Sequence, residues 1–86
     1  MTEFMIELYA PSGDSDVAAA ATARLGRHIE VVRSIFVAED ETCFVFVNAA
    51  ALGDVHAAAA RAQLELERVV ETTFDTGERP ILRGEP

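Results

Sequence analysis

The sequence predicts an α+β fold in which two helices pack on one face of a four-stranded antiparallel sheet. Residues 31–38 and 42–47 are short runs rich in Val, Ile and Phe, and they flank an acidic turn, which is typical of a β-hairpin. An Ala-rich segment of helical length lies on each side of this hairpin, and a segment with strand-like alternation opens the chain. The order strand, helix, strand, strand, helix, strand is the ferredoxin-like βαββαβ arrangement.

Residues 2–10 form the first predicted strand. Phe4, Ile6 and Leu8 alternate with polar or amphipathic neighbours, which is the two-residue period of a strand with one buried face. Residues 11–14 follow with the composition of a turn. Because crossovers between parallel strands are right-handed, the first and third strands are expected at the centre of the sheet.

Both predicted helices are rich in Ala, the residue with the highest helix propensity. The first covers residues 17–27, and Asp14 or Ser15 can cap it. The second covers residues 49–62. The side chains expected to face the sheet are Val17, Ala20, Ala21 and Leu25 in the first helix, and Leu52, Val55 and Ala59 in the second.

The C-terminal part of the chain has two interpretations. Residues 64–74 either extend the second helix or form the fourth strand, and their β-branched side chains favour a strand from about Leu66 onward. Residues 75–86 contain Pro and Gly with alternating charge, which predicts an irregular tail or an arm that wraps a partner. The folded domain is therefore expected to comprise residues 1–74.

Both faces of the predicted hairpin are too apolar to remain in water. Alternation places Ser34, Phe36, Cys43, Val45 and Val47 on one face, and Arg33, Ile35, Val37, Phe44 and Phe46 on the other. The helices can cover one face, so the other needs a partner. We expect a homodimer packed sheet to sheet, and the alternative is a monomer whose tail folds over the uncovered face.

Composition excludes several classes of protein. The 86 residues include 15 Asp and Glu against 7 Lys and Arg, a net charge of -8, which disfavours nucleic acid and anionic membranes because phosphate binding needs a positive surface. No segment has the ~20 apolar residues of a membrane span, and no signal peptide is recognisable, so a cytoplasmic protein is expected. A single cysteine excludes an internal disulfide.

Polar and aromatic residues of the uncovered face are the candidates for a ligand pocket. These are Glu7, Tyr9, Arg33, Phe44 and Phe46. Glu7 and Arg33 are expected to form ion pairs, and the rings to form an apolar wall. The alternative is that the polar side chains lie at an edge and only avoid desolvation.

Glu39, Asp40 and Glu41 form a carboxylate cluster at the tip of the hairpin. It either binds a divalent cation or is a solvated turn whose charges oppose aggregation through the sheet edge. The two histidines are far apart in the chain and lack the spacing of a zinc site. Cys43 lies in an apolar strand and is expected in the core.

Several segments resemble a family of small bacterial domains, the domain of unknown function 4242. They are residues 1–9 (MTEFMIELY), 33–37 (RSIFV), 39–44 (EDETCF) and 57–69, and the resemblance extends over about residues 1–74. It implies a ferredoxin-like fold, a homodimer and, in some members, nickel bound near the dimer interface. Glu39 and Asp40 match the family. Arg33 stands where the nickel-binding members have His, and a guanidinium does not ligate a metal.

The sequence thus predicts a small dimeric binding protein, without catalysis, that takes a nickel-like divalent metal ion or another small ligand at the dimer interface. The alternative is an enzyme of the dimeric α/β-barrel kind, acting on a small molecule in the cavity on the sheet face. A third hypothesis is an interaction module that recruits another protein through the uncovered sheet.

Overall fold

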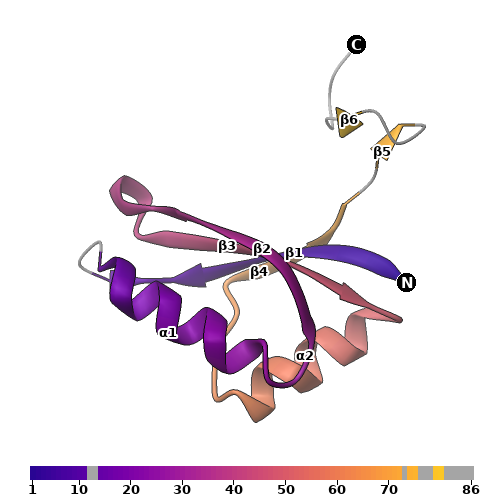
Figure 1. The fold of residues 1–86 in the computed structure, drawn as a ribbon, viewed down its shortest axis with the longest axis horizontal. Coiled ribbons are helices and arrows are strands. Elements are labelled where there is room, and N and C mark those ends of the chain that lie inside the picture. The colour runs from indigo at the N-terminus through magenta and orange to yellow at the C-terminus, as the bar shows by residue number, and fades with distance from the viewer. Residues whose placement is uncertain (12–13, 73, 76–78, 81–86) are drawn as a thin grey trace.

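The computed structural model describes residues 1–11, 14–72, 74–75 and 79–80 (Figure 1). Its main elements are β1 (Thr2–Tyr9), α1 (Ser15–Leu25), β2 (Glu30–Val37), the 3-10 turn η2 (Ala38–Asp40), β3 (Thr42–Ala49), α2 (Leu52–Arg61) and β4 (Arg68–Glu71). This is the predicted βαββαβ order, and the α+β ferredoxin-like fold is confirmed.

The four strands form one antiparallel sheet in the order β2-β3-β1-β4. The first and third strands are central, as the handedness of the crossovers predicts. Both helices lie on the same side of the sheet, and among the described residues no helix covers the other side (Figure 1). No helix within the described ranges is long and apolar enough to cross a membrane.

The core lies between the sheet and the two helices. Alternate residues of the central strands are buried there: Phe4, Ile6, Leu8 and Ala10 follow β1, and Cys43, Val45, Val47 and Ala49 lie on β3. Leu25 of α1 and Val55 of α2 pack against them and are fully buried. Cys43 is a core residue as predicted, with its Sγ 3.7 Å from the Thr22 hydroxyl.

Helix α1 begins at an Asp cap. The Asp14 carboxylate accepts hydrogen bonds from the backbone N–H groups of Asp16 and Val17, at 2.8 and 3.4 Å. The predicted buried stripe is partly wrong: Leu25 is buried and Ala21 packs on the core, but Val17 and Ala20 are exposed, and Ala18 is buried instead. A run of four alanines has no apolar contrast, so it does not define which side of the helix faces the sheet.

Helix α2 starts later than predicted because β3 continues through Ala49, which is still buried in strand alternation. Val55 and Ala59 are buried as expected. The prediction for Leu52 is wrong, since this side chain is 46% exposed at the first helical position. Ala58 and Ala62 complete the buried stripe.

The segment after α2 forms a strand, not a continuation of the helix. Strand β4 covers four residues and is shorter than predicted, because the chain before it packs Leu64 and Leu66 against the core in a non-strand path. Thr72 then donates its backbone N–H to the Glu3 carbonyl oxygen at 3.0 Å, which holds the end of β4 against β1.

Part of the predicted irregular tail is ordered as two short strands. β5 (Phe74–Asp75) and β6 (Arg79–Pro80) pair with each other in a separate antiparallel ladder. Residues 76–78 and 81–86 lie outside the described residues. The predicted partner-wrapping arm falls largely on these residues, so it stays a prediction.

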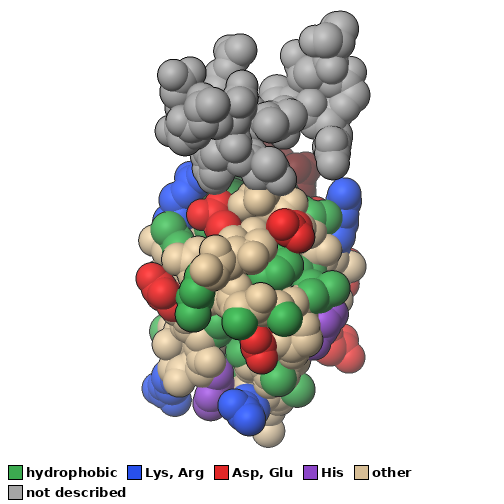
Figure 2. Space-filling view, turned by 90° about the vertical axis from the view of Figure 1, so that its right-hand side faces the viewer, with side chains coloured by type: hydrophobic (Ala, Val, Ile, Leu, Met, Phe, Trp, Pro, Cys, Tyr) green, Lys and Arg blue, Asp and Glu red, His purple; other side chains and the backbone are tan. Residues whose placement is uncertain are grey.

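Charged side chains do not gather into one block on the side of the molecule that Figure 2 draws. On the side drawn in Figure 2, acidic side chains lie singly between hydrophobic ones, and basic side chains lie at its margins. Among the described residues, this side therefore shows no basic patch of the kind that phosphate binding requires.

Candidate functional site

The five predicted pocket residues share the face of the sheet that the helices leave uncovered. Directly opposed residues of antiparallel strands point to the same side, and Glu7 is opposite Phe44 while Arg33 is opposite Phe46. Tyr9 follows from the alternation of β1. We call this surface the open face; it comprises Glu3, Met5, Glu7, Tyr9, Glu30, Arg33, Ile35, Val37, Thr42, Phe44, Phe46, Asn48, Arg68 and Val70.

The charged residues of the open face have different partners from those expected. Glu7 forms an ion pair with Arg68, with 3.6 Å between Oε2 and Nη1. Arg33 lies over the Phe46 ring, with its guanidinium carbon 4.2 Å from the ring centroid. A Glu7–Arg33 pair within one chain is not formed because β3 separates their strands, and two strand spacings amount to about 10 Å.

The sequence did not lead us to predict Arg68 as a residue of the site, although it is the partner of Glu7. Its role depends on the register of β4, in which Arg68 is opposite Glu7 and Val70 is opposite Met5. A strand of four residues has too little alternation to fix that register from sequence.

The open face combines apolar and aromatic surface with a few polar groups. Phe44 and Phe46 are half-buried by their neighbours, whereas Tyr9 and Ile35 are 57% and 43% exposed. Glu3, Glu7, Glu30, Arg33 and Arg68 are its charged residues, so its formal charge is -1, against -8 for the whole chain.

The acidic tip of the hairpin adjoins the open face. Glu39 and Asp40 are exposed on η2, and Glu41 ends this turn in the left-handed conformation with φ 50°. The Tyr9 hydroxyl donates to Glu41 Oε1 at 3.5 Å, so a predicted pocket residue contacts a predicted metal residue. Across the described part of the chain, no three His, Cys, Asp or Glu side chains are grouped closely enough to hold a metal ion.

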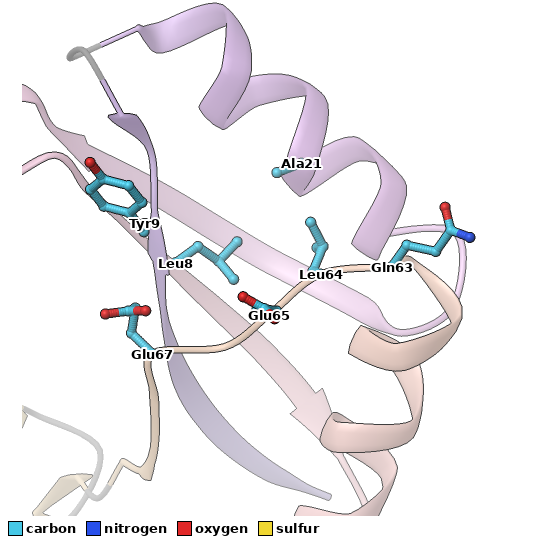
Figure 3. Close-up of a pocket in the computed structure, with 7 residues that line it drawn as sticks. All are labelled: Leu8, Tyr9, Ala21, Gln63, Leu64, Glu65 and Glu67. Atoms are coloured by element: carbon cyan, nitrogen blue, oxygen red, sulfur yellow. The ribbon is translucent and has the colours of Figure 1, made fainter.

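A pocket of about 500 Å³ lies at the sheet edge, where β1 extends beyond β4. It is lined by Leu8, Tyr9, Ala21, Gln63, Leu64, Glu65 and Glu67 (Figure 3). Tyr9 is the predicted pocket residue that contributes to it. The other lining residues were not predicted, because the pocket depends on where β4 begins and on the path of the chain between α2 and β4.

Comparison of the chain with protein-family models, curated proteins and solved structures found no match. The resemblance to the domain of unknown function 4242 therefore stays a prediction, as do the nickel site and the homodimer that it implies.

Proposed function

We propose that the chain is a small homodimeric binding protein whose two open faces pack together and enclose a small ligand or a nickel-like divalent metal ion. The observation that carries this proposal is the open face itself. It presents the apolar side chains of Met5, Ile35, Val37, Phe44, Phe46 and Val70 on the side of the sheet opposite the helices. Contiguous apolar surface of this kind marks an interaction site more often than bare surface of a monomer.

Charge supports a second copy as the partner. Two molecules that each carry a net charge of -8 repel one another over most of their surface. The open face has three glutamates and two arginines, a net charge of only -1, so two copies repel one another less there than over the rest of their surface. The open face also has an aromatic centre, which is the composition found at the cores of interfaces.

The polar groups of the open face support a ligand between the copies. The Glu7–Arg68 pair and the stacked Arg33 lie on either side of the Phe44 and Phe46 rings. Binding sites typically combine apolar walls with a few polar groups placed in this way. For a metal, Glu39, Asp40 and Glu41 offer oxygen ligands only, whereas nickel is well suited to imidazole. We therefore favour an organic ligand over nickel.

The dimer is tested with a matched pair of substitutions. Ile35 on the open face is 43% exposed, and Val17 on α1 is 44% exposed. We expect Ile35→Arg to yield a monomer in analytical ultracentrifugation, because it places a charge in the contact, and Val17→Arg to leave the dimer intact. The proposal is contradicted if the wild-type protein sediments as a monomer at both ends of a concentration range of about 100-fold. It is also contradicted if the two variants sediment alike.

The ligand is tested by thermal shift with nickel, other divalent metals and a panel of polar metabolites, together with metal analysis of the untagged protein. A ligand present at about 100 times its Kd stabilises the folded state by about 2.7 kcal/mol. We expect Arg33→Ala to abolish the shift caused by an organic ligand while the dimer persists. The absence of a shift with every compound would argue against a binding function.

A further inference from the structure

The pocket beside β1 is a second candidate site, separate from the centre of the open face. Strand β4 pairs with β1 only along Phe4–Glu7, so Leu8 and Tyr9 have no strand beside them on that edge. The chain between α2 and β4 passes there instead and borders an open hollow of about 500 Å³, a volume within the ordinary range for small-molecule sites.

The backbone N–H and C=O groups of Tyr9 point toward this pocket. On the β4 side, the Glu7 carbonyl oxygen accepts from the Glu67 N–H at 2.9 Å, and on the β3 side, the Ala10 N–H donates to the Glu41 carbonyl oxygen at 2.7 Å. Backbone groups alternate between the two sides of a strand, so those of Tyr9 point to the same side as those of Glu7. The β1–β4 ladder ends at Glu7, and the Tyr9 N–H and C=O therefore have no ladder partner there.

The side chains that line the pocket are apolar on its inner wall and acidic at its rim. Leu8, Ala21 and Leu64 form the inner wall, and the Tyr9 ring and the Glu67 carboxylate project to the other side of β1 (Figure 3). Glu65 and Glu67 are exposed, and neither has an ion pair within the described part of the chain.

We propose that this pocket binds a small organic cation, an amine or guanidinium compound with an aliphatic chain. The Glu67 carboxylate pairs with a charged nitrogen beside the Tyr9 ring, and the aliphatic part packs on Leu8 and Leu64 across the edge of β1. The Glu65 carboxylate adds negative charge on the Leu8 and Leu64 side. The Tyr9 carbonyl accepts a further N–H, and the Tyr9 ring is an additional partner for the cation. The net charge of -8 raises the concentration of cations near the surface.

The probe is agmatine, titrated calorimetrically into the full-length protein at about 150 mM NaCl, an ionic strength at which charges more than about 8 Å apart are largely screened. We expect saturable binding with one site per chain, which Glu65→Gln with Glu67→Gln weakens about tenfold or more. The control is Glu30→Gln with Glu71→Gln, which removes the same charge from two other exposed positions and leaves the affinity unchanged. Equal weakening in both double variants, or binding that does not saturate, overturns the proposal.

Two further measurements keep the test independent of folding and of the dimer. In the wild-type NMR spectrum, agmatine is expected to shift the amide signals of Tyr9, Glu65 and Glu67 and not those of Glu30 and Glu71. The Ile35→Arg variant is expected to bind agmatine as the wild type does, because Ile35 does not line this pocket. Shifts centred on Phe44 and Phe46, or loss of binding in Ile35→Arg, would place the cation on the open face and refute the separate site.

Discussion

Arg33 and Arg68 are the arginines of the open face, and they are held in different ways. Arg68 forms its ion pair while its own side chain is 66% exposed, and such surface pairs contribute at most about 1 kcal/mol. Arg33 lies over an aromatic ring, a contact worth about 0.5–1 kcal/mol at an exposed site. Stacking leaves the N–H groups at the edge of the guanidinium available to a ligand, so Arg33 is the better anchor of the two.

The stacking of Arg33 is measurable in a double-mutant cycle. We expect Arg33→Ala and Phe46→Leu to show a coupling energy of about 0.5–1 kcal/mol in urea unfolding at one protein concentration. The parallel cycle of Glu7→Gln with Arg68→Ala is expected to give a smaller coupling, since that pair is solvent-screened. A coupling of zero for Arg33 and Phe46 would show that the ring does not hold the guanidinium in solution.

At the scale of elements, the central strands could be predicted closely, and β4 and the helices less so. Each central strand alternates large apolar residues with polar or aromatic ones, so Phe4, Ile6 and Leu8 are buried as predicted. The helices owe their helix propensity to Ala, and uniform runs of Ala define neither the buried side of a helix nor its end. For that reason the prediction that Val17 and Leu52 face the sheet was wrong. The edge pocket could not be predicted, because it exists only where a short strand stops.

Gly53 is a weak point of α2. A methyl group added there meets no atom within 4 Å, and the backbone conformation is one that Ala adopts without strain. We expect Gly53→Ala to stabilise the protein by about 0.4–1 kcal/mol, because it lowers the entropy of the unfolded chain and raises helix propensity.

The matched control for Gly53→Ala lies on the same helix. Ala57 is exposed in the middle of α2, so Ala57→Gly is expected to destabilise by about 1 kcal/mol. Both are measured as changes in the urea midpoint. Changes of the same sign at the two positions would mean that α2 is not a regular helix in solution.

At the scale of the whole molecule, charge and apolar surface oppose each other in the proposed dimer. The open face favours association through burial of apolar area, and its own five charges sum to only -1. The rest of the chain carries -7 of the net charge of -8, so two copies repel at long range even when their contact surfaces fit. Salt weakens the charge repulsion and leaves the contribution of apolar burial in place.

Because salt screens repulsion and leaves apolar burial intact, the dimer should become tighter as ionic strength rises. The Debye length falls from about 30 Å at 0.01 M to about 10 Å at 0.1 M, so most of the change is expected below 0.1 M NaCl. Sedimentation equilibrium across this range measures it directly. If the copies were instead held by ion pairs between Arg33 of one and a glutamate of the other, the Kd would rise with salt, and the contact between the two open faces would be electrostatic in origin.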